Sequence, residues 1–159
     1  MTNKIMFNGF SGFKTIEYLR NHINEIPKEK GVYLIISQKN DPQFIDESIG
    51  GHFKDRNPSV SKIELEENWV SNEPIIYIGQ AGGKSSSATL FSRLKQYFNF
   101  GLGKPVGHWG GRYIWQLNKS NELIVAWKVT SEDSDLVETD LILEFKEKYG
   151  KRPFANLRK

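Results

Sequence analysis

The chain has 159 residues, of which 26% are charged and 13% aromatic, and its formal net charge is +3. This length suits one domain with its own hydrophobic core, and the slight basic excess permits nucleic-acid binding without requiring it. Because the sequence contains no cysteine, it excludes disulfides and thiolate zinc sites, and it favours a reducing, cytoplasmic location. No apolar run approaches the length of a membrane span or of a signal peptide, so we expect no membrane association.

The first half of the chain predicts a helix and then two strands separated by an insertion. Apolar residues at helical spacing predict a helix from 13 to 23. Branched apolar residues predict strands at 31–37 and 74–79. The polar stretch between them, about 38–73, predicts a long loop with a short helix near 63–70. Loops of this length in a compact domain are usually functional or disordered.

The second half predicts two helices flanking two strands. Apolar spacing predicts a helix at 88–98, and a glycine-rich segment follows it. The segments 111–117 and 122–130 predict two strands joined by a polar turn. A last helix is predicted at 135–149, with Gly150 as its C-cap. No repeat or linker interrupts the pattern, so we expect a single domain over residues 1–159.

The segment YIGQAGGKSSS, residues 77–87, is similar to a phosphate-binding loop but does not match one. Gly83-Lys84-Ser85 supplies the end of the pattern, yet the first glycine should stand at position 78, which is Ile78. We therefore expect no nucleotide cofactor, and the glycines predict a flexible turn between a strand and a helix.

Two tyrosines are the first candidate site residues. In the first strand Tyr33 points away from the face of Val32 and Leu34, and in the second Tyr77 points away from a face shared by Ile76 and Ile78. If these strands pair, both tyrosines lie on one surface of the sheet. The alternative is that each ring is part of the core and its hydroxyl bonds a carbonyl.

Two charged residues lie on apolar helix faces. Arg93 flanks the stripe of the helix at 88–98, where it reaches a site at the sheet edge or covers apolar surface with its stem. Glu138 lies on the inward stripe of the last helix, so its carboxylate is paired, caps the helix or binds a metal. Asp135 and Glu138 also have the spacing of a capping box, and both readings stay open.

These residues resemble the GIY-YIG nuclease family in their order along residues 31–156. The two name motifs correspond to Gly31-Val32-Tyr33 and Tyr77-Ile78-Gly79. Arg93 stands in a Leu-x-x-Arg-Leu context, Glu138 precedes a Leu-Ile pair, and Pro153 to Asn156 forms a Pro-x-x-Asn. The chain differs from the family in the long interval between the name motifs, in Gln80 where a lysine is common, and in Tyr97 where a histidine sometimes stands.

The resemblance implies an α+β (α/β) fold with a small, mostly antiparallel central sheet flanked by helices. It also implies hydrolysis of DNA phosphodiesters with one divalent cation, Mg²⁺ or Mn²⁺, bound by Glu138. Arg93 would stabilise charge on the phosphate, Tyr33 would act as general base, and Tyr77 would orient water or phosphate. Asn156 would hold the site by hydrogen bonds. Since a tyrosine has a pKa near ~10, Tyr33 needs help from a neighbour, for which the candidates are Lys84 and His108.

Other basic residues are candidates for nucleic-acid binding. His108 and Arg112 lie among glycines, which favours either a phosphate or base contact or a tight turn. Lys54 and Arg56 in the insertion either contact the DNA or belong to a solvated loop. Arg152 in the basic tail either contacts the backbone of a nucleic acid or is a solvent-exposed charge.

Two functions therefore remain in view. The first is a stand-alone, metal-dependent DNA endonuclease of the restriction or repair type. The second is a non-catalytic nucleic-acid-binding domain of the same fold. The segment Glu144-Phe145-Lys146 also matches the end of an Asp…Glu-x-Lys nuclease motif, but that motif belongs on a strand and this segment is predicted to be helical, so we discard it.

Overall fold

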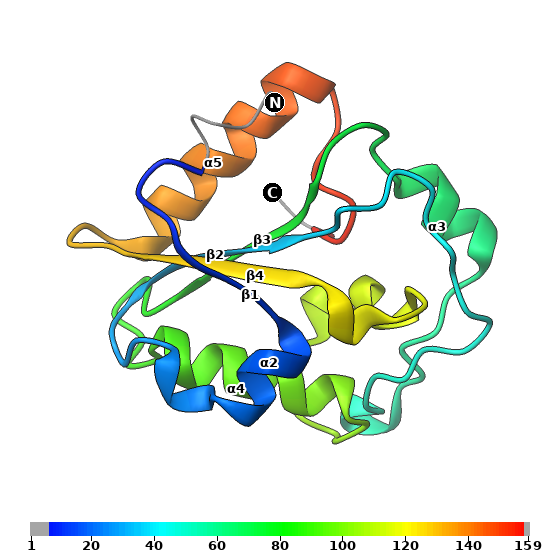
Figure 1. The fold of residues 1–159 in the computed structure, drawn as a ribbon, viewed down its shortest axis with the longest axis horizontal. Coiled ribbons are helices and arrows are strands. Elements are labelled where there is room, and N and C mark those ends of the chain that lie inside the picture. The colour runs from blue at the N-terminus through cyan, green and yellow to red at the C-terminus, as the bar shows by residue number, and fades with distance from the viewer. Residues whose placement is uncertain (1–6, 158–159) are drawn as a thin grey trace.

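The computed structural model describes residues 7–157 and arranges them in three layers, with a four-stranded sheet between helices (Figure 1). The strand order is β1-β4-β2-β3, and every neighbouring pair is antiparallel. The α+β fold class with an antiparallel sheet is therefore confirmed. The elements in chain order are β1 (Ser11–Thr15), α2 (Ile16–Asn21), η1 (Ile23–Glu25), β2 (Gly31–Ile36), η2 (Phe53–Asp55), α3 (Lys62–Asn68), β3 (Ile75–Ala81), α4 (Leu90–Gly101), η3 (Trp109–Gln116), η4 (Ser120–Glu122), β4 (Ile124–Val129) and α5 (Ser134–Tyr149).

The strand β2 is buried on both faces because helices cover the sheet from both sides. Leu34 and Ile36 pack in a cluster with Ile142 and Phe145 of α5, while Tyr33 belongs to the larger cluster that includes α2 and α4. Figure 1 shows α5 on one side of the sheet and α2 and α4 on the other. A strand covered on both faces is apolar along its whole length, which is why residues 31–36 form a continuous apolar run.

The two longest helices have well-defined ends. The Thr89 hydroxyl accepts from the Ser92 amide at 3.0 Å, and the Ser92 hydroxyl accepts from the Thr89 amide at 2.9 Å, so α4 begins with a capping box. The cap of α5 is Asp133, whose carboxylate accepts from the Asp135 amide at 3.1 Å. The predicted cap at Asp135 is thus wrong, whereas Gly150 is the C-cap with φ 72° as predicted.

A β-bulge in β3 changes which residues share a face. Ile35 pairs with Tyr77 and Ile36 with Ile75, so Ile76 has no partner on β2. Ile76 therefore packs in the same cluster as Tyr77, while Ile78 packs in the cluster of the opposite face. The prediction that Ile76 and Ile78 share a face is wrong for this reason.

Two predicted elements differ from the structure for one common reason. Residues 11–15 form β1 and pair with β4, so the predicted helix at 13–23 begins only at Ile16 and breaks at His22. Since β1 and β2 occupy both sides of β4, residues 111–117 cannot pair with it. Residues 111–116 belong to the 3₁₀ segment η3 instead, in which Tyr113, Ile114 and Trp115 are all buried, and Leu117 makes an isolated bridge with Phe44.

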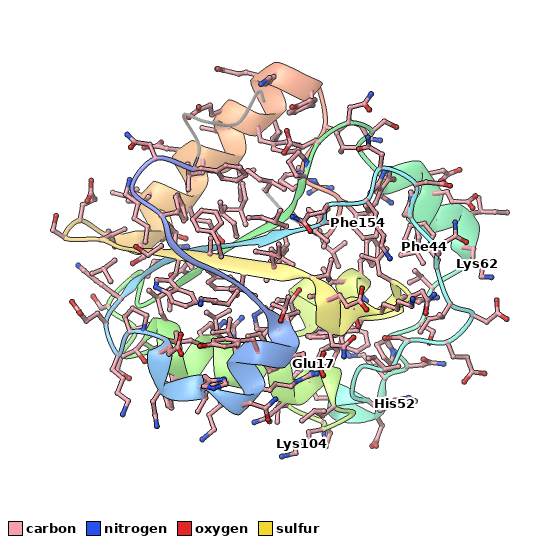
Figure 2. All side chains as sticks on the ribbon, in the orientation of Figure 1. Glu17, Phe44, His52, Lys62, Lys104 and Phe154 are labelled. Atoms are coloured by element: carbon pink, nitrogen blue, oxygen red, sulfur yellow. The ribbon has the colours of Figure 1, made fainter. Side chains whose placement is uncertain are left out.

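The insertion, residues 37–74, packs along η3 and against the C-terminal segment. The fully buried Gln116 holds it in place, because its amide nitrogen donates to the carbonyls of Ile45 at 3.1 Å and Val60 at 2.8 Å. Phe44 and Phe154 stack with ring centroids 5.7 Å apart (Figure 2). The insertion is thereby joined to the two segments that flank the edge strand β3.

Candidate active site

Tyr33 and Tyr77 lie on the same face of the sheet, on the neighbouring strands β2 and β3. Their ring centroids are 6.1 Å apart, and both rings belong to the larger apolar cluster. Gly79 pairs with Tyr33, and a Cβ at this glycine would lie 2.3 Å from Cζ of Tyr33. Because only glycine leaves this space, the Tyr33 ring can lie across β3, which is the edge strand.

A cavity of about 430 Å³ lies beside this edge of the sheet, and we call it the edge cavity. Its walls come from β2, β3 and the loop after it, α4, η3, α5 and the C-terminal segment. The lining residues are Tyr33, Tyr77, Gln80, Lys84, Arg93, Gly110, Asp135, Glu138, Ile142, Asn156 and Leu157. The structure thus brings together six residues that the sequence analysis singled out: Tyr33, Tyr77, Lys84, Arg93, Glu138 and Asn156.

His108 lies behind Tyr33 and is buried, with 1% of its surface exposed. Its Nε2 is 2.8 Å from the Tyr33 hydroxyl, and its ring stacks on Tyr97 with centroids 3.6 Å apart. Burial lowers the pKa of His108 well below 6.5, and the charge of Arg93 lowers it further. The imidazole is therefore neutral at ordinary pH and bonded to the tyrosine that the sequence analysis proposed as general base.

The hydroxyls of Tyr33 and Tyr97 are also held in their neutral form. Burial raises the pKa of Tyr33 well above 10.0, and the neighbouring Tyr77 adds to this, while Arg93 acts in the opposite direction. Burial likewise raises the pKa of Tyr97, whose hydroxyl donates to the Gly111 carbonyl at 2.5 Å. The imidazole of His108 comes from another segment to stack on the Tyr97 ring.

Arg93 projects from α4 into the edge cavity and is held by two hydrogen bonds. Its Nη1 donates to Oε1 of Gln96 at 2.7 Å and to the Gly107 carbonyl at 3.1 Å. The second bond ties the guanidinium to the residue before His108. Arg93 therefore fixes the glycine-rich segment and at the same time places a positive charge in the cavity.

Two carboxylates of α5 line the opposite wall. Asp135 and Glu138 are three positions apart, so both side chains lie on the same face of the helix. The Asp133 cap also accepts from the Lys84 amide at 3.1 Å, and Lys84 Nζ is 3.8 Å from the Asp135 carboxylate. The loop after β3 is therefore fastened to the first turn of α5, and the cavity has two positive and two negative side chains.

Asn156 closes the open edge of β3. Its side chain accepts from the Ile78 amide at 2.9 Å and donates to the Ile78 carbonyl at 2.9 Å. The neighbouring Ala155 amide donates to the Ile76 carbonyl at 2.7 Å. Asn156 thus replaces a neighbouring strand for one residue of β3 and holds the edge that carries Tyr77.

Four predicted nucleic-acid contacts lie outside the lining of the edge cavity. Arg112 is half-buried in η3, and Lys54 and Arg56 are exposed in the insertion. Arg152 is exposed in the C-terminal segment, and its guanidinium donates to the carbonyl of Leu157, which does line the cavity.

Five lining residues were not predicted for the site: Gln80, Gly110, Asp135, Ile142 and Leu157. Asp135 was predicted as a cap, although its position three residues before Glu138 could have placed it in the cavity. Gln80 follows the second name motif directly, and Leu157 follows Asn156. Gly110 carries no sequence signal, because its place depends on how η3 packs. Gln80 accepts from the Gly83 amide at 2.9 Å and shapes the loop that carries Lys84.

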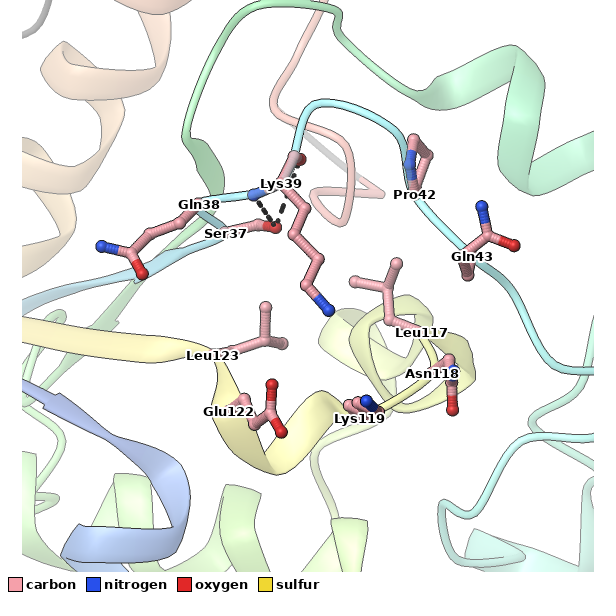
Figure 3. A pocket seen from close by; sticks show the side chains of 10 residues that line it. All are labelled: Ser37, Gln38, Lys39, Pro42, Gln43, Leu117, Asn118, Lys119, Glu122 and Leu123. Carbon is pink, nitrogen blue, oxygen red and sulfur yellow. Dashed lines mark hydrogen bonds between the residues drawn. The ribbon is translucent and has the colours of Figure 1, made fainter.

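A second cavity, of about 290 Å³, lies beyond the carboxyl end of β2 (Figure 3). It is lined by Ser37, Gln38, Lys39, Pro42, Gln43, Leu117, Asn118, Lys119, Glu122 and Leu123. Its lining includes no tyrosine, histidine or arginine, and no residue predicted for the site. The edge cavity is therefore the candidate active site.

In the described part of the chain no group of three or more His, Cys, Asp and Glu side chains is arranged to hold a metal. Among the helices of residues 7–157 none has both the length and the apolar character to cross a bilayer. Comparison with protein-family models, curated proteins and solved structures gave no significant match.

Proposed function

We propose that this chain is an endonuclease that hydrolyses phosphodiester bonds of DNA with one divalent cation, Mg²⁺ or Mn²⁺. The observation that carries the proposal is the set of side chains around one cavity of about 430 Å³: two tyrosines, an arginine and two carboxylates. The GIY-YIG-like order of motifs assigns a role to Tyr33, Tyr77, Arg93 and Glu138, which lie far apart in the sequence and close together here. The absence of cysteine agrees with a cytoplasmic enzyme.

The donors in the edge cavity fit a hard cation. Glu138 and Asp135 offer carboxylate oxygens, and neither histidine nor cysteine lines the cavity. Mg²⁺ prefers oxygen ligands and keeps several waters besides one or two carboxylates and a substrate phosphate. Glu138 would be the main ligand, with Asp135 beside it. The bound cation would neutralise charge on the phosphate and make phosphorus easier to attack.

Tyr33 and His108 would form a proton relay. The neutral imidazole, when protonated on Nδ1, accepts the Tyr33 hydroxyl proton at Nε2 over 2.8 Å. As water attacks phosphorus, its proton would pass to the Tyr33 oxygen while the Tyr33 proton passes to Nε2. The phosphorus–oxygen bond to the leaving strand would break, and the leaving oxygen would take a proton from solvent. This relay needs no free tyrosinate, which burial disfavours by raising the pKa of Tyr33. It does need a transient imidazolium, which burial and Arg93 disfavour by lowering the pKa of His108, and the negative charge of the bound phosphate would offset this.

Arg93 would stabilise the negative charge that grows on the phosphate oxygens. Its guanidinium is held by Gln96 and Gly107 before substrate binds, so little reorganisation is needed. Tyr77 would orient the attacking water or the phosphate. Asn156 would take no part in the chemistry and would only hold β3 in position, through its two hydrogen bonds to Ile78.

A plasmid-nicking assay tests the proposal. Purified protein is incubated with supercoiled DNA and Mg²⁺ or Mn²⁺, with and without chelator, and compared with Glu138→Gln and Arg93→Gln. We expect metal-dependent nicking by wild type and a loss of about 10²-fold or more in each variant, the range for removing one charge-stabilising group. The matched control is Glu144→Gln, which changes an exposed carboxylate of the same helix.

Two outcomes contradict the proposal. Glu138→Gln that nicks like wild type removes this carboxylate from the mechanism. Wild type that binds DNA but never nicks it supports the alternative, a non-catalytic nucleic-acid-binding domain of the same fold.

A further inference from the structure

Two arginines from distant parts of the chain lie over one tryptophan. Cζ of Arg56, in the insertion, is 4.4 Å from the centroid of the Trp109 ring, and Cζ of Arg112, in η3, is 4.5 Å from it. Arg112 also donates to the Trp109 carbonyl at 3.1 Å. Trp109 is half-buried and packs against the core. The indole therefore holds both guanidinium groups in place by cation–π contact.

These arginines belong to segments that contribute to the lining of the edge cavity. Gly110, which stands between Trp109 and Arg112, lines the cavity. Arg152 is bonded to another lining residue, because its Nη1 donates at 3.0 Å to the carbonyl of Leu157. Arg112 and Arg152 both lower the pKa of Tyr113, so both lie near its hydroxyl. We call Arg56, Arg112 and Arg152, which come from the insertion, η3 and the C-terminal segment, the arginine rim.

The charges of the arginine rim are not neutralised by ion pairs. Within residues 7–157 the ion pairs found involve Lys62 and Lys84, and none involves an arginine of the rim. Glu64 is the carboxylate that acts on Arg112, but it accepts the hydroxyl of Tyr113. Burial lowers the pKa of Arg112, Tyr113 and Glu64 act in the opposite direction, and the positive charge of Arg56 adds a smaller lowering. A polyanion bound here would relieve this repulsion.

The backbone just before Arg56 adopts the left-handed region at two residues. Lys54 and Asp55 have φ of 55° and 61°, a region that residues other than glycine rarely adopt. Such strain persists where the surrounding structure enforces it and is frequent at binding sites. Here it turns the chain so that Phe53 packs near Gly107 and Arg56 lies over Trp109.

We propose that the arginine rim binds phosphates of a DNA duplex on one side of the phosphate in the edge cavity. This inference rests on the proposed function, since it takes the edge cavity as the place of the cleaved phosphate. Guanidinium groups match phosphate oxygens in geometry and charge. Proteins that bind single strands stack bases on open aromatic faces, whereas the Trp109 ring is covered by arginines and core. The rim therefore selects the backbone of a duplex and not bases.

Equilibrium binding without metal tests the rim separately from cleavage. The probes are a fluorescently labelled duplex of about 20 base pairs and one of its single strands, titrated in chelator at about 50 and about 200 mM salt. Each phosphate contact adds about 0.9 to the slope of log K against log salt. For Arg56→Ala/Arg112→Ala we expect weaker duplex binding and a slope smaller by about two contacts, so the difference in Kd from wild type shrinks roughly tenfold between the two salt concentrations. We also expect wild type to prefer the duplex.

The control is Lys39→Ala/Lys119→Ala, which removes two positive charges from the lining of the second cavity. It should retain the wild-type slope. Arg56→Ala alone changes an exposed side chain and should lower the slope by about one contact, which guards against misfolding of the double variant.

Unchanged slopes in the rim variants, or a preference of wild type for the single strand, would overturn the inference. If wild type nicks plasmid while the rim variants keep its slope, only the inference fails. If the rim carries duplex binding but wild type never nicks, only the nuclease proposal fails.

Discussion

Replacing Gly79 by alanine should displace Tyr33 from its place across the edge strand. The added Cβ would lie 2.3 Å from Cζ and 2.5 Å from the hydroxyl of Tyr33, whereas ordinary van der Waals contact begins near 3.4 Å. The ring must therefore move by about 1 Å, the difference between these distances. Tyr33 is only 1% exposed, and it packs near Tyr77, Tyr97 and His108, so the open space beside the ring is the edge cavity that it lines.

The expected cost has two parts. Overpacking a filled core costs about 1–3 kcal/mol. Breaking the bond between Tyr33 and His108 leaves buried polar atoms without a partner, which costs a further ~1–3 kcal/mol. We expect the free energy of unfolding to fall by about 2–6 kcal/mol, and nicking to be lost with it if the proposed function holds.

Urea denaturation at neutral pH measures the cost. The matched control is Gly110→Ala, because a Cβ there meets no atom within 4 Å; its free energy of unfolding should change by less than about 1 kcal/mol. The same substitution is also made in the variant Tyr33→Leu, which lacks the clashing atoms. There Gly79→Ala should lower the free energy of unfolding by clearly less than it does in wild type. Equal stability of Gly79→Ala and wild type, or the same cost in both backgrounds, would refute the reasoning.

Two further predictions concern His108 and Asn156. Burial lowers the pKa of His108 below the ordinary 6.5, so the unfolded chain binds a proton first as pH falls. The free energy of unfolding should therefore decrease below pH ~6.5, by at most ~1.4 kcal/mol per pH unit from this group, until the lowered pKa is reached. Urea unfolding from about pH 7 to about pH 5 measures this, and the free energy of unfolding should fall less steeply with pH in His108→Gln than in wild type. An identical dependence on pH in both proteins would be contrary evidence. Asn156→Ala removes both bonds to Ile78 and should lower the free energy of unfolding by about 2–4 kcal/mol. Thermal melting beside the exposed-site control Asn118→Ala measures this, and equal melting temperatures would contradict the role of Asn156 at the sheet edge.

Local pattern alone was enough to predict the elements whose apolar period is strong. The runs that form β2, β3 and β4, the stripe of α4 and the glycine that ends α5 are all local features, so the sequence determined them without knowledge of the fold. The same holds for the chain order of Tyr33, Tyr77, Arg93 and Glu138, which was enough to nominate them for one site. Their shared cavity is seen in the structure, and their chemical roles stay predictions.

Only the tertiary structure decided which segments obtained a partner. Residues 11–15 became a strand, and 111–117 did not, because the open side of β4 was filled by the former. The bulge at Ile76 and the cap at Asp133 likewise depend on contacts with other elements. His108 bonds Tyr33, from which it is separated by 75 positions in the sequence, and the arginine rim comes from three segments. Gly110 lines the cavity because of the way η3 packs. The physical reason is that a sequence pattern reflects the preferences of residues close together in the chain. Which distant segments form hydrogen bonds with one another or bury one another depends on all the segments that could occupy the same place.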